Sequence, residues 1–453
     1  MPTMTRHRRR WAALAVLLVA EAMNLLDATI VQVAGPAIHA DLPGPAAGIP
    51  WFSAAYTLPF AAFLITGGRL GDILGRAKVF KLGVAGFVFA SLVCAAAQDA
   101  GLLIGARAVQ GAAAALIIPQ TIGLIRALFD GAELAKALGA IGPVMGLSAV
   151  TGPLLGGLLT QAISWRAAFL VNVPLGLAVL FAARLLREDR AATRPRLDLT
   201  GTALVVAGAG LLVYPLIDPA GTNWAVLAAG ATVLIVFGFQ QRRAAAPLVE
   251  PSLFAHRGFP AALAGSLLFF AVMTGLMQVV PMQLQLGFGA DVRTAGLTLL
   301  PLSVGLAVSS YVAGAWLVPK FGSRVMFAGL ALLLTGLLAM EAGGVGAYPW
   351  ALGLCGLGMG TFTVPFFTAA LHRVRPHETG SAAGLLNAVQ QLGGTLGVAL
   401  LGGLYLGTGT AATALGLGAA LAVAAAVAVV PLASRKGVRV TEPPARGNAP
   451  EAQ

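Results

Sequence analysis

The sequence predicts an all-α integral membrane protein, and two observations carry this prediction. Hydrophobic residues make up 58% of the 453 residues and charged residues only 10%, whereas soluble domains contain about 45–50% apolar residues even with glycine included. The apolar residues also fall into runs of about 20, the length that a helix needs to cross a hydrocarbon core about 30 Å thick. This composition excludes a soluble globular protein and a disordered chain, which would combine low hydrophobicity with high net charge.

Fourteen such runs follow one another along the chain, and clusters of proline, glycine and charged residues separate them. A transmembrane barrel would instead show short segments of alternating hydrophobicity, and the sequence has no such pattern. We therefore predict fourteen transmembrane helices, at residues 12–36, 50–69, 79–97, 102–127, 135–161, 166–186, 199–217, 223–240, 259–284, 294–318, 323–341, 346–370, 379–405 and 410–432.

The positions of the basic residues predict which side of the membrane each loop faces. When the N-terminus is placed in the cytoplasm, all but three of the 29 Lys and Arg fall in termini or loops on that side. Arg166 and Arg293 lie in outer loops, and Arg107 lies within a span. This asymmetry follows the positive-inside rule and predicts an inner-membrane protein with both termini in the cytoplasm. The net charge of +12 then reflects membrane topology, so we expect no nucleic-acid partner.

The order of the spans divides the chain into two blocks of six helices with two helices between them. We expect an N-terminal bundle at 1–190, two inserted helices with basic linkers at 191–257, a C-terminal bundle at 258–432 and a disordered cytoplasmic tail at 433–453. Transporters built from repeats usually bind their substrate near the midplane, between the repeats. We expect no metal or other cofactor, because the five histidines lie in loops or termini without ligand spacing and no phosphate-binding motif occurs.

A glycine-rich loop of mixed charge joins the second and third spans. Its glycines permit a tight turn and close helix approach. The order of its residues resembles the loop signature of the major facilitator superfamily, whose fold combines two six-helix bundles. The resemblance implies a conformational switch in which Asp72 bridges the bundles, facing the start of the thirteenth span near 379–381. The residues that carry the resemblance are Gly68, Asp72, Gly75, Arg76 and Lys78.

The first span carries acidic residues on one face. Helical geometry places Glu21, Asn24 and Asp27 within an arc of about 120°. A charged carboxylate at this depth is costly unless it is paired, so such a group can take up and release a proton as a cavity opens to either side. The segment 26–36 also resembles the first-span signature of the fourteen-span drug–proton antiporters of the EmrB/QacA type, with two departures. We expect Asp27 and Glu21 to couple transport to protons; the alternative is a buried carboxylate neutralised by a neighbouring donor.

The fourth span contains the single cation that we expect inside the membrane. Arg107 does not lose its charge by deprotonation, so it requires a carboxylate, backbone carbonyls or water around it. Arg107 and Gln110 belong to a stretch that resembles the family's fourth-span signature, with Ala113 where glycine is usual. We expect Arg107 to tune the proton site through a shared polar network, and a purely structural tie between helices is the alternative.

The fifth span is rich in glycine and proline, which permit close helix packing and bend the helix. From physics alone the pattern indicates a bent, tightly packed helix. It also resembles the antiporter signature that exporters of the family carry, so the resemblance implies export. Two further stretches, 165–174 and 380–394, are similar to other family signatures. The residues of the fifth-span pattern are Gly142, Pro143, Gly146, Gly152, Pro153 and Gly156.

Polar, aromatic and methionine side chains inside the spans are candidates for the substrate cavity. Aromatic rings and methionine offer adaptable apolar contact and cation–π attraction, although each such residue alone more often packs in a core or faces lipid. Spans nine to fourteen contain no acidic residue near their middle, which favours neutral or monovalent substrates over divalent cations. The candidates are Asn24, Tyr56, Gln110, Phe269, Met273, Gln278, Phe362, Asn387 and Gln390.

Together these features predict a proton-coupled efflux transporter that exports hydrophobic or monovalent cationic drugs by alternating access. We expect it to work as a monomer in the lipid bilayer and to have no enzymatic activity. One alternative is a proton-coupled exporter of one defined metabolite or self-made antibiotic, which a narrow substrate profile would favour. Another is a membrane sensor or lipid-handling protein without solute turnover, which would show no proton flux when ligand is added.

Overall fold

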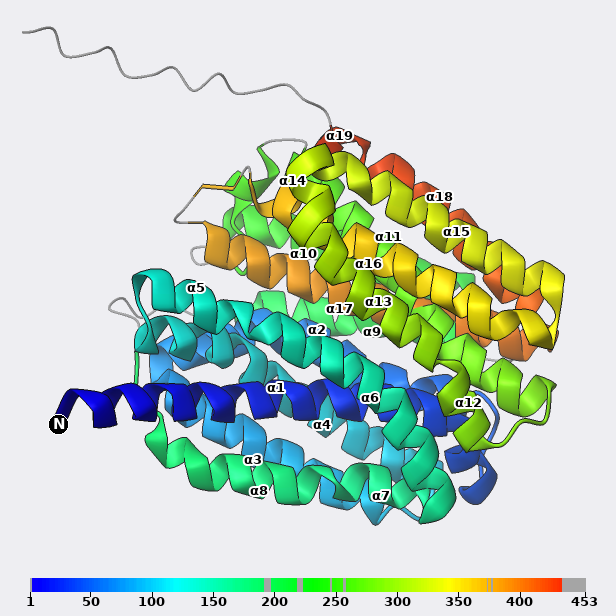
Figure 1. The fold of residues 1–453 in the computed structure, drawn as a ribbon, viewed down its shortest axis with the longest axis horizontal. Coiled ribbons are helices and arrows are strands. Elements are labelled where there is room, and N and C mark those ends of the chain that lie inside the picture. Colours follow the sequence, from blue (N-terminus) through cyan, green and yellow to red (C-terminus); the bar gives the residue numbers. More distant parts are fainter. Residues whose placement is uncertain are drawn as a thin grey trace, which may run out of the picture.

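The computed structural model describes residues 2–190, 197–217, 223–244, 247–255, 258–372, 374–375 and 378–433. Within these residues every regular element is a helix, and most helices run side by side along the long axis of the molecule (Figure 1). The expected tail at 433–453 falls outside the described residues except for Ala433, as do parts of the expected linkers within 191–257.

The first group of helices occupies the lower part of Figure 1. Successive long helices in this group alternate in direction and are joined by short connections, as expected for consecutive membrane crossings. The helices are α1 (Pro2–Asp41), α2 (Gly48–Leu74), α3 (Arg76–Ala95), α4 (Ala100–Leu128), α5 (Gly131–Gly139), α6 (Ile141–Ala162), α7 (Trp165–Leu170) and α8 (Asn172–Ala182).

Prolines explain two breaks in this first group. The fifth expected span consists of α5 and α6, and the sixth consists of α7 and α8. A proline lacks the backbone N–H and clashes with the carbonyl four residues before it. Pro143 lies four residues after Gly139, where α5 ends, and Pro174 lies four residues after Leu170, where α7 ends. The same local chemistry therefore breaks both spans.

The second group occupies the upper part of Figure 1. Two π-helical turns interrupt its helices, at Gln283–Gly287 after the first helix and at Ala313–Leu317 after the third. The helices are α11 (Gly258–Met282), α12 (Val292–Thr298), α13 (Leu300–Val312), α14 (Val318–Phe321), α15 (Val325–Gly343), α16 (Tyr348–His372), α17 (Thr379–Thr408), α18 (Ala411–Ala428) and α19 (Val430–Ala433).

The described residues contain 13 helical segments that are long and apolar enough to cross a membrane. One of them, Val292–Gly343, has 52 residues and would extend roughly 78 Å as a straight helix, more than twice the thickness of a hydrocarbon core. It contains the tenth and eleventh expected spans and turns at Gly322, which has a φ of 64°. Each of the fourteen expected spans therefore overlaps one of these segments.

Each helix group has its own apolar core. One core is built from buried side chains of α1, α2, α3, α4 and α8, and the other mainly from α11, α15, α16 and α18. The groups contact each other where α2 packs against α17, α6 against α12 and α1 against α11. Two separate cores joined through a few helices are suited to rigid-body rocking, the usual basis of alternating access.

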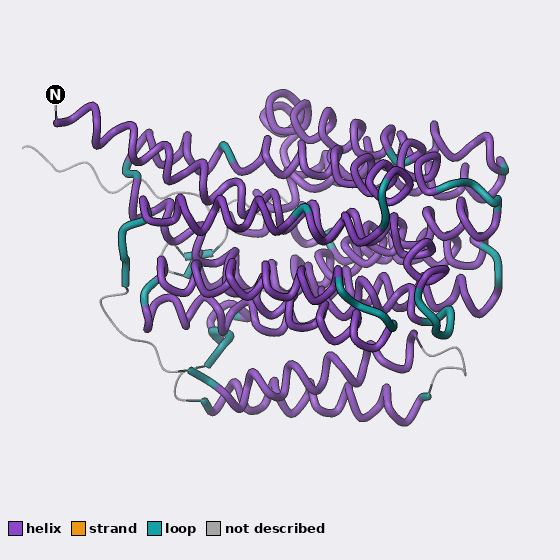
Figure 2. Tube along the Cα trace, turned by 90° about the horizontal axis from the view of Figure 1, so that it is seen from below, coloured by secondary structure: helices purple, strands orange, loops and turns teal. Residues whose placement is uncertain are grey.

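A hairpin of two further helices, α9 (Leu199–Ile217) and α10 (Trp224–Arg243), lies at one edge of the molecule. In Figure 2 it is the lowest pair of helices. Helix α9 packs against both α2 and α17, and the hydroxyls of Thr66 and Thr202 lie 2.8 Å apart. The hairpin therefore covers the junction between the two groups on this side.

The two ends of the helix bundle differ in charge. The start of α1 and the loop between α2 and α3 lie at one end, here called the basic face, which carries Arg76 and Lys78. The end of α1 and the start of α4 lie at the opposite end, here called the far face, which carries Asp41 and Asp99.

Helices α2 and α4 approach closely because glycine faces the opposing backbone at two positions. A Cβ on Gly67 would collide with the carbonyl oxygen of Ala115, and a Cβ on Gly111 would collide with the carbonyl oxygen of Tyr56. Small residues permit this approach between membrane helices. It brings Arg107, one turn before Gly111 on α4, within reach of the backbone of α2.

Candidate functional site

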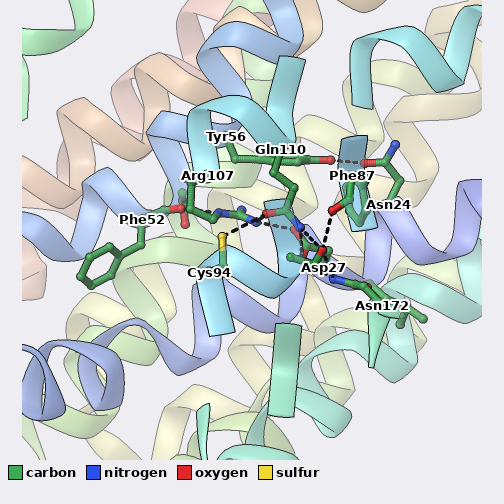
Figure 3. Close-up of polar contacts among 12 residues, drawn as sticks. Asn24, Asp27, Phe52, Tyr56, Phe87, Cys94, Arg107, Gln110 and Asn172 are labelled. Atoms are coloured by element: carbon green, nitrogen blue, oxygen red, sulfur yellow. Dashed lines mark hydrogen bonds and ion pairs between the residues drawn. The ribbon is translucent and has the colours of Figure 1, made fainter. Parts of the chain in front are cut away.

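A buried ion pair joins Asp27 of α1 to Arg107 of α4 inside the first helix group (Figure 3). Arg107 Nη1 donates to Asp27 Oδ2, and Arg107 Nε donates to the backbone oxygen of Phe52 in α2, 2.9 Å away. Each charged side chain has at most 1% of its surface exposed, so water does not screen their attraction. The cation inside the span thus has the carboxylate and carbonyl partners that its chemistry requires.

Two amide side chains hold the other carboxylate oxygen of Asp27. Oδ1 accepts hydrogen bonds from Gln110 Nε2 at 2.9 Å and from Asn172 Nδ2 at 2.7 Å. Ser91 of α3 extends the network, because its hydroxyl accepts from Gln110 at 2.8 Å and donates to the backbone oxygen of Phe87 at 2.8 Å. Among the described residues, every direct polar partner of Asp27 donates a hydrogen, which stabilises the ionised carboxylate.

Aromatic rings cover the guanidinium group of Arg107. Its Cζ atom lies 4.4 Å from the ring centre of Tyr56 and 5.8 Å from that of Phe169, distances at which a cation is attracted to a ring face. The Tyr56 hydroxyl donates in turn to Asn24 Oδ1. Tyr56 and Asn24, both candidates for the substrate cavity, therefore belong to the surroundings of the ion pair in this conformation.

The second acidic residue of α1, Glu21, has different surroundings. It is 9% exposed, and the polar side chain of Thr121 in α4 lies close to it. Within the described part of the chain, no Lys, Arg or His side chain lies within 4.0 Å of its carboxylate. Among the described residues, Asp27 therefore has a cationic partner and Glu21 has none.

The loop between α2 and α3 is tied to the end of its own helix group. Asp72 accepts from Arg76 at 2.8 and 3.1 Å, and Arg76 Nη1 also binds Asp189 Oδ2 at 2.7 Å. The carboxylate of Glu188, next to Asp189, accepts from the backbone N–H of Ala77 at 3.0 Å. In this conformation Asp72 is therefore paired with Arg76 of its own helix group, and the expectation that it faces the start of the thirteenth span stays a prediction.

The linker that follows α10 instead connects the two helix groups at the basic face. Arg69 of α2 donates to the backbone oxygen of Pro247. A few residues further on, Glu250 Oε1 accepts from the Ser381 hydroxyl of α17 at 3.0 Å. The linker therefore contacts both groups next to the hairpin.

Asp198, which precedes α9, anchors this region. Its carboxylate accepts from the backbone N–H of Gly201 at 2.8 Å and from the side chains of Gln240 and Gln241 at 3.0 and 2.6 Å. Partial burial favours the neutral carboxyl group, but these hydrogen bonds outweigh it and hold the pKa of Asp198 below its ordinary value of 3.8. The anchor is therefore fully ionised at neutral pH, and its contribution to stability is lost only as the pH falls through the lowered pKa.

The glycine-rich helix α6 packs along only part of its length. A Cβ on Gly152 would collide with the Thr29 side chain of α1, and one on Gly156 would lie 3.1 Å from the Cα of Ile30. A Cβ on Gly142 or Gly146, in contrast, would meet no atom within 4 Å. The half of α6 toward the far face is therefore tightly packed, and the half toward the basic face is not.

The two helix groups meet through polar contacts along α6, from its far-face end to its middle. Gln161 Nε2 donates to Asp291 Oδ2 at 3.2 Å, and Gln161 Oε1 accepts from the backbone N–H of Arg293 at 3.1 Å. Ser303 Oγ donates to the backbone oxygen of Ala149 at 2.9 Å. Between these contacts a Cβ on Gly296 would lie 2.6 Å from the oxygen of Pro153. This conformation is therefore closed between α6 and α12 at the far face.

The predicted cavity residues of the second group fall into two sets. Phe269 and Phe362 stack with ring centres 4.1 Å apart and are fully buried in the core, so neither faces a cavity in this conformation. Gln278 is also buried and accepts from the Ser53 hydroxyl at 3.2 Å, which makes it a contact between α11 and α2. The partly exposed candidates are Met273, Asn387 and Gln390.

Two members of the polar network, Ser91 and Asn172, were not predicted as site residues. Both are polar residues inside apolar spans, and Asn172 falls in the stretch 165–174 that is similar to a family signature. Their polarity was a usable signal. Their meeting with Asp27 was not predictable from spacing, because α1, α3 and α8 converge only in the folded bundle.

Comparison with known proteins gives one consistent result. The model of a family described as Major Facilitator Superfamily matches residues 17–398. The chain is 43% identical to "Probable actinorhodin transporter" of Streptomyces coelicolor, over 88% of this chain and 73% of that protein. It is 37% identical to "Puromycin resistance protein pur8" of Streptomyces alboniger, over 87% and 81% of the two chains. It is 33% identical to "Multidrug resistance protein Stp" of Mycobacterium tuberculosis, over 84% and 73%.

Solved structures show the same fold at low sequence identity. The peptide transporter POT in complex with alafosfalin has a TM-score of 0.70 at 14% identity, covering 94% of this chain and 96% of that one. The human organic anion transporter MFSD10 has a TM-score of 0.63 at 15% identity, covering 93% and 99%. At such identity these likenesses establish the fold alone.

Proposed function

Since the chain belongs to the major facilitator superfamily, we propose that it is an efflux transporter that exports amphiphilic small molecules in exchange for protons. Relatives that match most of its length carry names that refer to antibiotic transport, antibiotic resistance and multidrug resistance. Export is the activity that would account for transport and resistance alike.

The buried pair of Asp27 and Arg107 is the observation that supports proton coupling. Arg107 stays charged at every physiological pH, so only Asp27 can take up and release a proton within the pair. Protonation would remove the attraction that holds α1 to α4 and would alter the surroundings of Tyr56, whose ring covers Arg107. A proton would in this way bias the packing of helices next to the expected substrate cavity. Glu21, which has no cationic partner in the described part of the chain, is the second candidate carrier.

The orientation of the basic face follows from the positive-inside rule. We place this face in the cytoplasm, together with both termini. The conformation closed between α6 and α12 at the far face is then one in which the outer side is shut. The unpacked half of α6, around Gly142 and Gly146, lies on the cytoplasmic side, where substrate would enter.

The loop of Asp72 acts in this proposal as the conformational switch. In the present conformation Arg76 binds Asp72 and Asp189 within the first helix group. When the cytoplasmic side closes, Asp72 would leave Arg76 and face the N-terminus of α17, where an anion is stabilised by about 0.3–1 kcal/mol. That energy is sufficient to bias two conformations of similar stability.

The substrate class follows from charge and from the relatives. In the described part of α11 to α18, acidic side chains lie only at helix ends or in connections, at Asp291, Glu341 and Glu378. A divalent cation would lack a second carboxylate, so a neutral or monovalent amphiphile is favoured. One proton crossing ~100 mV releases ~2.3 kcal/mol and one pH unit adds ~1.4 kcal/mol, enough for a gradient of several hundredfold of a neutral substrate.

A second candidate is an exporter dedicated to one self-made antibiotic. The 43% identity to a probable actinorhodin transporter supports it, since that name refers to a single compound. A narrow substrate profile would favour this candidate, whereas protection against many unrelated compounds would favour a multidrug exporter.

Expression in cells that lack their main exporters tests the proposed function. We expect the chain to lower the accumulation of at least one antibiotic or dye from a panel, because the names of its relatives refer to antibiotic transport and resistance. A protonophore should abolish the effect, since it removes the driving force. Unchanged accumulation of every compound would contradict export, and export that persists with the protonophore would contradict proton coupling.

A further inference from the structure

Asn172 is the first residue of α8 and lies next to Asp27 (Figure 3). It is fully buried. Its Nδ2 donates to Asp27 Oδ1 at 2.7 Å and lies 3.4 Å from Ser91 Oγ. Its Oδ1 atom is also buried, and within the described residues it has no hydrogen-bond partner. A buried acceptor left without a partner is costly, so this atom requires an explanation.

Protonation of Asp27 would give the unpartnered oxygen of Asn172 a donor. An ionised carboxylate only accepts hydrogen bonds, whereas a protonated carboxyl group also donates one through its O–H. Its direct partners here are Arg107, Gln110 and Asn172, and all of them donate in this conformation. Once Asp27 is protonated, the new O–H needs an acceptor within the same dry pocket.

Only one of these three partners has a free acceptor. Arg107 has no acceptor atom at all. Gln110 has one, but its Oε1 already accepts from Arg107 Nη1 at 2.7 Å and from the Cys94 thiol at 3.8 Å. The carbonyl oxygen of Phe52 is likewise bound by Arg107 Nε. The unpartnered Oδ1 of Asn172 remains.

We propose that Asn172 is the positioning residue that allows Asp27 to change its protonation state inside the bundle. Its amide donates to the carboxylate, and after a half-turn of the amide group its oxygen accepts the O–H of the carboxylic acid. The proton comes from water on one side of the membrane, forms the O–H bond on Asp27 and returns to water on the other side. The amide neither gains nor loses a proton. This inference rests on the proposed role of Asp27 in proton coupling.

The charges around Asp27 leave this role to an amide. Helices α6, α8 and α11, which pack against α1, carry no titratable side chain in their described ranges. The cations of α7 and α12 lie toward the far face, where Arg166 binds Asp41. The turn Ala183–Leu185, which also packs against α1, carries Arg184 toward the basic face, where it lies over the ring of Phe181. The titratable groups that face Asp27 are Arg107 of α4, Tyr56 of α2, Cys94 of α3 and, on its own helix, Glu21.

The pH dependence of export by Asn172→Leu in liposomes tests the proposal. The variant loses both a donor to the carboxylate and an acceptor for the acid. Hydrogen bonds to a charged group are the stronger kind, so the pH midpoint of export should move upward by about one unit. The maximal rate should also fall, because the acid form has lost its acceptor. A merely structural role of Asn172 would lower the rate without moving the midpoint.

Infrared difference spectroscopy gives a second readout, since the carboxyl stretching band of protonated Asp27 depends on what accepts its O–H. The band is identified by its absence in Asp27→Asn and should shift in Asn172→Leu. Ser266→Ala is the matched control: Ser266 is a buried hydroxyl of α11 without a partner among the described residues, and its removal should leave band and midpoint unchanged. If Asn172→Leu does not fold, Asn172→Ser replaces it; its hydroxyl donates and accepts, so the midpoint should stay within a few tenths of a unit of the wild type while the band shifts.

The outcomes separate this inference from the proposed function. If Asp27→Asn abolishes pH-dependent export while Asn172→Leu keeps the wild-type midpoint and band, the role of Asn172 is wrong and that of Asp27 stands. If Asp27→Asn keeps pH-dependent export, the proposed proton site itself is wrong, and the inference falls with it.

Discussion

Asp27→Asn and Arg107→Gln, each made alone, are expected to destabilise the protein more than the two substitutions together. Removing one partner leaves the other buried without compensation, which typically costs about 3–5 kcal/mol. The surroundings offer little relief, because both side chains are almost fully buried and Arg107 has no second carboxylate among its partners. The double variant keeps two neutral amides in a pocket that already contains Gln110 and Asn172, so most of the lost stability should return.

The same three variants separate folding from transport. Thermal melting of the purified proteins measures stability, and export driven by a pH gradient measures coupling. We expect the double variant to melt within a few degrees of the wild type and yet to show no pH-driven export, since no group in the pair can then bind a proton. A double variant that melts as low as the single ones would mean that the pair does not act as a unit. Gradient-driven export by the double variant would move the proton site to Glu21 or elsewhere.

Gly157→Val is expected to open the far face and to stop transport without unfolding the protein. A Cβ at this position of α6 would lie 2.9 Å from the oxygen of Val292, 3.2 Å from the Cα of Arg293 and 3.4 Å from that of Gly296. All three are backbone atoms of α12, and backbone cannot move aside as a flexible side chain does. The two further carbons of valine would hold α6 and α12 apart, so we expect at least a tenfold loss of export.

Spin labels at Gln98 and Val345, on far-face connections of the two helix groups, would report this opening. Pulsed electron resonance should show a longer mean distance in Gly157→Val than in the wild type. Gly146→Val is the matched control on the same helix, because a Cβ there meets no atom within 4 Å, and its far-face distance should equal that of the wild type. An unchanged distance in Gly157→Val would show that this contact does not hold the outer side closed.

Much of the fold could be predicted because the hydrophobicity of consecutive residues alone indicates a membrane span. The length and hydropathy of the apolar runs indicated the position of every span. They did not indicate two features of the helices within these spans. Prolines at 143 and 174 divide the fifth and sixth spans into pairs of helices, a consequence of the missing N–H that the pattern of hydrophobicity does not reveal. Spans ten and eleven join at Gly322 with so short a turn that they form one helical segment.

The site was predictable only in part, because its contacts depend on how helices distant in sequence pack together. A lone arginine in a span needs a carboxylate, backbone carbonyls or water, so chemistry predicted that Arg107 shares a polar network with the proton site but not which acidic residue it binds. The contacts of Ser91 and Asn172 depend on where α3 and α8 lie around α1, which spacing does not encode. The burial of Phe269 and Phe362 likewise depends on how their helices are rotated about their axes. The sequence does not show whether an aromatic residue faces the core or a cavity.

The central claim is that Asp27 exchanges a proton for the exported molecule. The most direct test reconstitutes the wild type and the double variant Asp27→Asn/Arg107→Gln in liposomes that contain a pH-sensitive dye, and adds a substrate found in the cell assay. We expect proton movement that starts on addition of substrate to the wild type, scales with its transport and is absent in the double variant. Substrate transport by the wild type without proton movement, or equal proton movement by the double variant, would contradict it.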